Sequence, residues 1–319
     1  MTAPAPRVVG TRAELAAALA EIRAQGHRVG LVPTMGALHV GHASLMTHAR
    51  DRVGEDGAVV VSIFVNPLQF APGEDLDRYP RTLDADLAVC AAHGVDVVFV
   101  PAVEEVYPEG VGAGSAGAAI TVDPGPLGGV LEGAARPTHF RGVLTVVAKL
   151  FGLVRPDVAV FGQKDYQQLV LVRRMAAELC LGVEVVGAPT IREDDGLALS
   201  SRNRYLDDAQ RRAALVLSRA LSAGAASADR GTEAVLAAAH AVLRGEGADV
   251  EIDYLALTAP DLGDAPGSGE ARLLVAARVG STRLIDNVPL VLGGPGSTPA
   301  SSSAPTPTSA RQPVHEGAH

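Results

Sequence analysis

The sequence predicts an α/β protein with a doubly wound, Rossmann-like parallel sheet in an N-terminal domain and a smaller α+β C-terminal domain. Through residue 190, short Val- and Ile-rich runs alternate with helical patterns. Continuously apolar strands of this kind are typical of parallel sheets that helices cover on both faces. After residue 190 the pattern changes to a long helical stretch followed by strand candidates. We therefore expect a larger ligand-binding domain at 1–190, a smaller domain at 191–292 and a disordered tail at 293–319.

The first domain divides into strand and helix candidates along the chain. The expected strands are the apolar runs Val29–Val32, Ala58–Val65, Val95–Val100, Ala159–Phe161 and Val183–Val186. The segments between them carry helical patterns at Ala43–Arg50, Leu83–His93 and Leu144–Val154. Pro33–Ala37 is expected to be a turn, because proline and glycine punctuate it.

The second domain begins with an Ala/Leu/Arg-rich segment, Asp208–Arg244, that is expected to be helical. Strand candidates follow at Asp253–Leu257, Arg272–Val279 and Thr282–Val288. From Gly293 the composition turns to Gly, Pro, Ser, Thr and Ala, which offers too little apolar surface to offset the entropy of ordering. Gly110–Ala118 is similarly glycine-rich and is expected to be a mobile loop, with a lid and a solvated insertion as equal alternatives.

Composition excludes several classes of function. The 319 residues carry a formal net charge of −9 with 47% hydrophobic residues, which does not fit a protein with a basic nucleic-acid-binding face. Cys90 and Cys180 offer no disulfide framework, and both are expected to be core thiols within helices, in a reducing compartment. Arg7, Arg12 and Glu14 interrupt any leader-like run, and no apolar run is long enough to span a bilayer. We expect a cytoplasmic protein with no nucleic-acid or membrane partner.

The most informative segment is Leu31–His42, which reads LVPTMGALHVGH. It joins the first strand to a helix start, and helix N-termini bind anions because their first N–H groups lack partners. Gly36 and Gly41 let the backbone approach a phosphate without obstruction by Cβ. His39 and His42 are expected on one face of the helix start, where imidazoles can donate to phosphate oxygens. The weaker alternatives are a chance surface pair of histidines and half of a metal site, and no third ligand follows at metal-site spacing.

Two later segments add polar groups, one after a strand and the other in a loop near the domain junction. Phe161–Gln168 (FGQKDYQQ) places Lys164, Asp165 and Gln168 near a helix N-terminus, although Asp165 could simply cap that helix. Leu199–Tyr205 (LSSRNRY) sets hydroxyls and guanidiniums in a loop suited to a triphosphate, with a helix-capping turn as the alternative. Ligands of doubly wound sheets bind beyond the carboxyl ends of the strands. Three polar clusters follow expected strands and are therefore expected at one edge: Pro33–His42, Asn66–Phe70 and Gly162–Asp165.

Taken together, these segments resemble the pantoate–β-alanine ligase family of the HxGH nucleotidyltransferase superfamily. The matching segments, in order, are PTMGALHVGH (33–42), SIFVNPLQF (62–70), DLDRYPRT (75–82), LEGAARPTHFRGV (131–143), FGQKDYQQL (161–169), DGLALSSRNRYL (195–206) and LLVAARVGSTRLIDN (273–287). The ordered set runs through both domains and leaves out the tail.

The resemblance implies a two-step reaction. ATP adenylates the carboxylate of pantoate with loss of pyrophosphate, and the amine of β-alanine then attacks the adenylate to release AMP and pantothenate. It implies ATP as co-substrate, Mg²⁺ and a homodimer, with ATP and pantoate bound by the domain at 1–190. The residues that match the family's ATP contacts are Met35, Gly36, Ala37, Leu38, His39, Val40, Gly41, His42, Gly162, Gln163, Lys164, Asp165, Ile191, Leu199, Ser200, Ser201 and Arg202.

Within this set the resemblance gives His42 the role of proton donor. His39, Lys164, Ser200, Ser201 and Arg202 would stabilise the phosphoryl charge. Gln69 and Gln168 match the glutamines that bind pantoate, with Gln69 also placed towards β-alanine. Candidates of second rank in matching segments are Asn66, Tyr79, Arg136 and His139.

The chain departs from the family at two positions. Leu199 stands where relatives commonly have methionine, which keeps volume and apolarity. Gln163 stands where many have glutamate, which removes a negative charge beside the phosphates. Asp84 and Asp86 lie in a segment whose acidic residues approach the metal in some relatives, but no Mg²⁺ ligand is assigned.

Two other functions compete with the ligase. One is a nucleotidyltransferase that joins ATP to a phosphorylated small molecule, which would share HxGH but not the Gln69 and Gln168 segments. The other is a catalytically silent nucleotide-binding protein, against which the intact set of His39, His42, Lys164 and Ser200–Arg202 argues.

Overall fold

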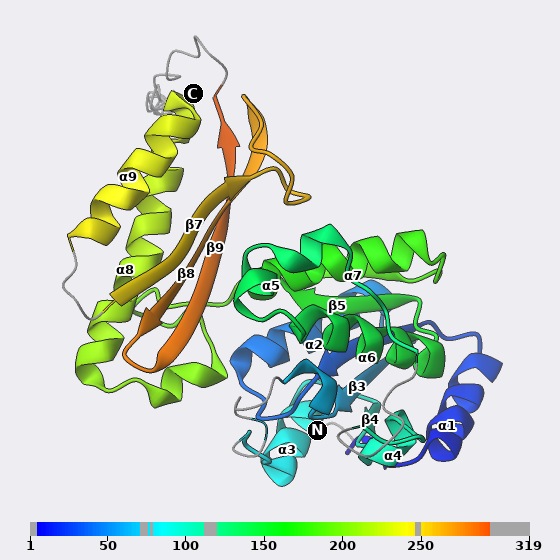
Figure 1. Ribbon diagram of the computed structural model, residues 1–319. Coiled ribbons are helices and arrows are strands. Elements are labelled where there is room, and N and C mark those ends of the chain that lie inside the picture. The colour runs from blue at the N-terminus through cyan, green and yellow to red at the C-terminus, as the bar shows by residue number, and fades with distance from the viewer. Residues whose placement is uncertain (1–4, 71–75, 77–78, 112–119, 246–249, 294–319) are drawn as a thin grey trace, which may run out of the picture.

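The computed structural model describes residues 5–70, 76, 79–111, 120–245 and 250–293, and it contains two sheets (Figure 1). The larger sheet has six strands in the order β1-β4-β3-β2-β5-β6, and every pairing in it is parallel. These strands are β1 (Arg7–Val9), β2 (Val29–Thr34), β3 (Ala58–Ile63), β4 (Val97–Phe99), β5 (Val158–Gly162) and β6 (Glu184–Ala188). The doubly wound parallel sheet that the sequence predicts is confirmed.

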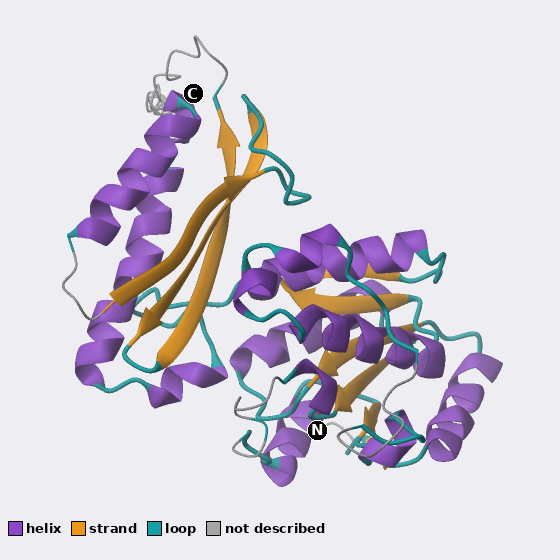
Figure 2. Cartoon of the chain, in the orientation of Figure 1, coloured by secondary structure: helices purple, strands orange, loops and turns teal. Residues whose placement is uncertain are grey.

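Helices cover both faces of this sheet (Figure 2). On one face, α1 (Arg12–Ala24), α6 (His139–Val154) and α7 (Tyr166–Glu178) pack on strand residues such as Leu31 and Phe161. On the other face, α2 (Val40–Val53) and α3 (Leu83–Ala92) pack on residues such as Val32 and Val160. Successive strand residues point to opposite faces, which is why the central strands are apolar at nearly every position. Two one-turn helices, α4 (Val103–Val106) and α5 (Glu132–Ala135), complete the domain.

The strand order fixes where a ligand can bind. Strand β2 pairs with β3 on one side and with β5 on the other, so the direction of winding reverses between β2 and β5. Crevices at such switch points, beyond the carboxyl ends of the strands, are the usual ligand sites of this architecture. The segment with His39 and His42 follows β2, and the segment with Lys164 follows β5. The expected convergence of these clusters on one edge is therefore confirmed.

The C-terminal domain consists of a three-stranded antiparallel sheet and two long helices. The sheet contains β7 (Val250–Thr258), β8 (Gly269–Val279) and β9 (Thr282–Leu292), in that order. Helices α8 (Asp208–Ala225) and α9 (Thr232–Arg244) pack on one face of it around a separate hydrophobic cluster. In Figure 1 the sheet lies between this helix pair and the N-terminal domain.

Several expectations about elements need correction. Pro33 and Thr34 belong to strand β2 rather than to a turn. The expected helical segment Asp208–Arg244 is two helices. Helix α8 ends at Ala225, and a short 3-10 helix, Ala228–Arg230, follows it. Gly231, at φ 88°, then redirects the chain as the N-cap residue of α9. Strand β1, only three residues long, was not expected. Cys90 is buried in α3 as predicted, but Cys180 is exposed in the turn after α7, where its φ is 52°.

Two expectations concern segments outside the described residues. Residues 294–319 of the predicted tail lie outside the described residues. Most of the glycine-rich segment Gly110–Ala118 also lies outside them. Among the residues that the structure does describe, none of the helices has both the length and the apolar character of a membrane span.

Candidate active site

His39 and His42 are held at the N-terminus of α2 by hydrogen bonds to the backbone. His39 is the N-cap residue, and its Nδ1 accepts from the N–H of Gly41 at 3.1 Å. The N–H of His39 donates to Nδ1 of His42 at 3.3 Å, and the two ring centroids lie 4.1 Å apart. A backbone N–H can only donate, so both Nδ1 atoms are unprotonated. Each neutral ring therefore carries its proton on Nε2.

Electrostatics keep both imidazoles neutral. Burial, with the neighbouring His39 as a second cause, lowers the pKa of His42 to about 3. Burial also lowers the pKa of His39, and the positive charges of Lys164 and Arg204 lower it further. Asp165 acts in the opposite direction on both rings. At neutral pH the two histidines are hydrogen-bond donors through Nε2–H and not cations.

The loop before His39 is fixed by a buried carboxylate. Asp86, only 2% exposed, accepts from the N–H of Ala37 at 3.0 Å and from the N–H of Leu38 at 2.8 Å. Thr82 Oγ1 donates to the same carboxylate at 3.1 Å. Gly36 has a φ of 84°, and a Cβ there would lie 2.9 Å from Asp86 Oδ2. Asp86, from the segment left open for a metal, is instead occupied with positioning the loop.

The second polar segment forms a 3-10 turn between β5 and α7. Lys164, Asp165 and Gln168 from this segment all line the same cleft. Asp165 is the N-cap residue of α7, but its side chain makes no capping hydrogen bond. Burial raises the pKa of Asp165, but the positive charges of Lys164 and Arg202 outweigh it and hold the pKa below its ordinary value. Asp165 is therefore an ionised carboxylate among cations.

The Ser200–Arg202 segment is both a helix-capping turn and a polar loop that faces the cleft, the two alternatives that the sequence left open. Ser200 caps the short 3-10 helix Ser201–Tyr205 by accepting from the N–H of Arg202 at 3.3 Å. Ser200 and Arg202 also line the cleft with Lys164. The N–H of Leu199 donates to the carbonyl of Ile191 at 2.9 Å, which ties the start of this segment to the domain linker. A capping turn thus presents the cationic loop to the cleft.

The two glutamines occupy different surroundings. Gln168 lines the cleft. Gln69 is 9% exposed; its Oε1 accepts from Asn66 at 3.2 Å, and its Nε2 donates to the sulfur of Met35 at 2.9 Å. The backbone carbonyl of Gln69 accepts from Arg136 at 3.2 Å and contacts His139 Nδ1 at 3.0 Å. Gln69 therefore contacts Met35 in the loop before His39, and its backbone contacts Arg136 and His139, which line the cleft.

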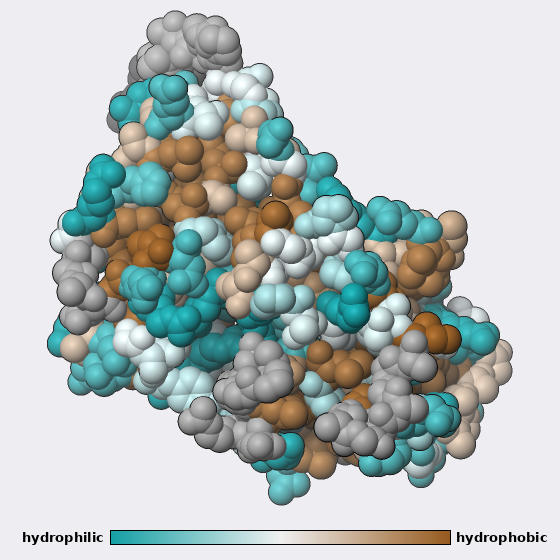
Figure 3. Space-filling view, viewed as in Figure 1, coloured by the Kyte–Doolittle hydropathy of each residue, from teal (hydrophilic) through white to brown (hydrophobic). Residues whose placement is uncertain are grey.

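The cleft has a volume of about 780 Å³ and lies between the two domains. In the space-filling view, hydrophilic residues surround the hollow where the domains meet (Figure 3). The expected site residues that line it are Lys164, Asp165, Gln168, Ser200, Arg202, Arg136 and His139. His39, His42 and Gln69 are not part of its lining, although Lys164 and Asp165 act on both histidines electrostatically. Val40, at the helix start, is 63% exposed, and Tyr79 lies edge-on to Phe70.

Residues with no role in the sequence analysis join the two domains across this cleft. Arg283 of β9 donates to both carboxylate oxygens of Glu132 at 2.6 and 2.8 Å, and its Nε donates to Asp253 at 2.5 Å. Tyr254 OH donates to Glu132 at 2.9 Å. Both Glu132 and Arg283 lie in segments that match the family, but their pairing depends on the approach of the two domains.

The donor set does not fit a metal cage made by protein alone. Within the described residues, no group of three or more His, Cys, Asp or Glu side chains is arranged to hold a metal ion. Asp86 is occupied with backbone amides, and Asp165 is the carboxylate next to Lys164 in the lining of the cleft. The chemistry proposed below therefore has no step that depends on a protein-bound metal.

Comparison with known proteins agrees with this geometry. The family model described as pantoate-beta-alanine ligase matches residues 7–289. The chain belongs to the pantoate–β-alanine ligase family. A pantothenate synthetase from Nocardioides sp. is 62% identical over 308 residues, covering 94% of this chain and 90% of that protein.

Solved structures of the ligase family share the architecture. A crystal structure of pantothenate synthetase from Thermus thermophilus superimposes with a TM-score of 0.79 at 49% identity, covering 88% of this chain and 98% of that one. A pantoate-beta-alanine ligase from Francisella tularensis, described as complexed with β-γ ATP and β-alanine, gives 0.70 at 30% identity, covering 89% and 97%. As a pantoate–β-alanine ligase, this chain is an enzyme that joins pantoate to β-alanine.

Proposed function

We propose that this ligase works through a pantoyl adenylate. A pantoate carboxylate oxygen attacks the α-phosphorus of ATP, the bond to the β-phosphate breaks, and pyrophosphate leaves. The amine of β-alanine then attacks the acyl carbon, the bond to AMP breaks, and the amine loses a proton as the amide forms. The observation that carries this proposal is that Lys164, Ser200 and Arg202 face the same cleft as Gln168 at the switch point of the sheet.

The phosphate-facing groups have defined tasks in this proposal. Lys164 and Arg202 neutralise charge that develops on the phosphoryl oxygens and on the leaving pyrophosphate, and Ser200 and Ser201 donate hydrogen bonds to it. Met35–His42, Gly162–Asp165, Ile191 and Leu199 surround the nucleotide. This assignment is supported by the fixed loop geometry at Asp86 and Asn287, which limits reorganisation during the reaction.

His42 donates through Nε2 in this proposal. Its lowered pKa and its occupied Nδ1 keep one defined proton on the ring. His39 is held in the same tautomer by Gly41. The pair thus forms neutral donors that stabilise the oxygens of the α-phosphate without the need to lose a proton beforehand.

Gln168 and Gln69 bind pantoate in this proposal, because an amide both donates to a carboxylate and accepts from a hydroxyl. Gln69 must exchange its contacts with Asn66 and Met35 for substrate contacts, so pantoate binding is coupled to movement of its side chain. Mg²⁺ arrives with the nucleotide as MgATP, because this ion commonly binds through phosphates and keeps several waters.

The C-terminal domain acts as a lid in this proposal, with 191–292 moving on 1–190 about a hinge at 190–196. The Glu132–Arg283 pair across the cleft supports a closed arrangement. Crystal structures with and without ATP test this, and an unchanged relation between the domains contradicts it. A homodimer remains a prediction from the family resemblance.

The test of the function is the release of AMP and pyrophosphate from purified protein given MgATP and pantoate, with and without β-alanine. We expect AMP only when both substrates are present and pyrophosphate exchange into ATP with pantoate alone. The variant His42→Ala should lose both activities. ATP binding without turnover under all conditions contradicts the proposal and favours the silent nucleotide-binding alternative. Exchange that fails without β-alanine contradicts the adenylate.

A further inference from the structure

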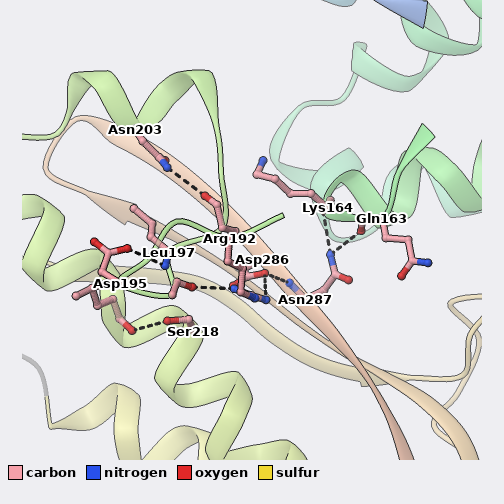
Figure 4. Close-up of polar contacts among 12 residues, drawn as sticks. Gln163, Lys164, Arg192, Asp195, Leu197, Asn203, Ser218, Asp286 and Asn287 are labelled. Atoms are coloured by element: carbon pink, nitrogen blue, oxygen red, sulfur yellow. Dashed lines mark hydrogen bonds and ion pairs between the residues drawn. The ribbon is translucent and has the colours of Figure 1, made fainter. Parts of the chain in front are cut away.

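One strand of the C-terminal domain holds both phosphate-facing segments of the site. Asn287 of β9 is 3% exposed, and its Nδ2 donates to the carbonyls of Gln163 and Lys164 at 3.0 and 2.9 Å. Its Oδ1 accepts from Arg272 Nε at 2.8 Å. Figure 4 shows this amide pointing at the turn that carries Lys164. Both the donor and the acceptor end of the amide are therefore used in this contact.

Arg272 holds the same turn from a second direction. It is 5% exposed, lies over the ring of Tyr166 at 4.0 Å from the centroid, and donates to Gln163 Oε1 at 3.0 Å. Burial lowers its pKa to about 10, so it remains a cation at neutral pH. Gln163 Nε2 donates in turn to the carbonyl of Gly187 at 3.0 Å. Gln163 therefore uses one acceptor and one donor. A glutamate at this position could still accept from Arg272 but could not donate to Gly187.

Asp286, the neighbour of Asn287, holds the other segment. Its carboxylate, 4% exposed, accepts from Arg192 NH1 and NH2 at 2.7 and 2.9 Å. Arg192 NH1 also donates to the carbonyl of Gly196 at 3.1 Å, and Arg192 pairs with Ala198 in a short antiparallel bridge. This contact fixes the chain that leads into Ser200–Arg202. Figure 4 shows Asp286 and Asn287 extending to these two different parts of the site.

We infer that Asp286 and Asn287 are positioning residues that set the spacing between Lys164 and the Ser200–Arg202 loop. Side chains of adjacent strand residues point to opposite sides, so one rigid strand reaches both segments at once. Lys164 and Ser200 both face the small pocket next to Asp286. The inference rests on the proposed function, in which the cations of these segments act on the same phosphates.

The experiment compares Asn287→Asp, Asp286→Asn and a control, Leu290→Ala, in the full-length chain. Both site variants keep the shape of the side chain. Asn287→Asp loses the N–H donors to Gln163 and Lys164, and Asp286→Asn loses the negative charge that pairs with Arg192. The control removes buried packing from the same strand, at a residue that is 8% exposed and outside the site. We measure kcat, the KM for pantoate, the melting temperature, and the dissociation constant of MgATP by calorimetry.

We expect both site variants to lower kcat by about 10²-fold, as a misplacement of about 1 Å does, with the KM for pantoate within about threefold of wild type. We expect MgATP to bind about tenfold more weakly. Leu290→Ala should lower the melting temperature but keep kcat within about twofold. In a Lys164→Ala background, Asn287→Asp should cause less than about threefold further loss of MgATP affinity, because both changes act through Lys164.

A fully additive loss in the double variant overturns the inference, and so does a wild-type kcat in both Asn287→Asp and Asp286→Asn. Equal losses of kcat in the control and the site variants also overturn it, since general destabilisation then explains the effect. If wild-type protein makes no AMP, the proposed function fails. The calorimetric comparison still decides the positioning role in that case, because it needs no turnover.

Discussion

Gly41 lies directly against the imidazole of His39. A Cβ at Gly41 would be 2.9 Å from Cε1 and 3.0 Å from Nδ1 of that ring. We predict that Gly41→Ala displaces His39 and breaks the hydrogen bond that sets its tautomer. Activity should fall by about 10- to 100-fold, because in the proposed mechanism His39 would no longer be placed to donate to the phosphate. Steady-state assays of AMP release check this.

The matched control for Gly41→Ala is Gly152→Ala in α6. A Cβ at Gly152 meets nothing within 4 Å, so alanine should raise stability by about 0.5–1 kcal/mol and leave activity unchanged. If Gly41→Ala retains full activity, the close packing of this ring has no part in the chemistry.

His42 should not titrate in the physiological range. Its pKa is lowered to about 3, chiefly by burial, so the folded protein keeps the ring neutral while the unfolded chain takes up a proton near its ordinary value of 6.5. NMR of the ring Cε1–H should show no shift between pH 5 and 8, with His42→Gln used for assignment. A midpoint near 6.5 contradicts the prediction.

The same lowered pKa has a consequence for stability. Below about pH 6.5 the unfolded chain binds a proton that folded His42 does not, so acid destabilises the fold through this residue. The free energy of unfolding should fall by up to about 1.4 kcal/mol per pH unit on this account. Denaturant unfolding of wild type and His42→Gln from pH 7 to 4 checks the sign. The variant should lose less stability than the wild type.

Asp86 should behave as a loop anchor and not as a metal ligand. The backbone N–H groups of Ala37 and Leu38 both donate to the carboxylate of Asp86. In Asp86→Asn the amide NH2 would face one of these donors, so one of the two hydrogen bonds would be lost. We predict about a 10- to 100-fold fall in kcat/KM with an unchanged Mg²⁺ dependence. Asp84→Asn, exposed on the same helix, should behave as wild type. Rescue of Asp86→Asn by excess Mg²⁺ would make Asp86 a metal ligand instead.

The ion pair between Glu132 and Arg283 should hold the two domains together. Glu132→Ala leaves Arg283, 17% exposed in its side chain, with Asp253 as its remaining carboxylate. The loss should cost about 1–3 kcal/mol of unfolding free energy and increase the radius of gyration in X-ray scattering without nucleotide. For comparison, Glu21→Ala removes an exposed pair with Arg7 and should cost less than about 1 kcal/mol.

Local patterns were sufficient to predict the sheet and the histidine segment. The strands β2, β3 and β5 are apolar at nearly every position because both their faces are covered. The segment that contains Gly36, His39 and Gly41 is fixed partly by a local hydrogen bond, from the backbone N–H of Gly41 to His39. Strand β1 and the break between α8 and α9 were missed. Three residues carry little pattern, and α8 ends at Ala225 within an alanine-rich run that continues the helical pattern.

The contacts between the two domains were not predicted from the sequence, for a physical reason. Asn287 meets Gln163 and Arg283 meets Glu132 at sequence separations of 124 and 151 residues. Such contacts depend on how two separately folded layers approach each other, which no local periodicity contains. The same holds for Asp86, whose carboxylate meets the loop at Ala37 across 49 residues.

The bonds from Asn287 also bear on synthesis of the chain. The ribosome synthesises the turn at Gln163–Asp165 long before β9. The carbonyls of Gln163 and Lys164 therefore lack the hydrogen bonds from Asn287 until residue 287 has been added. Domains generally fold from the N-terminus as they are made. All six strands of the N-terminal sheet are thus synthesised well before the partner of these two carbonyls, and a chain that stops short of β9 lacks the contact that holds the turn of Lys164.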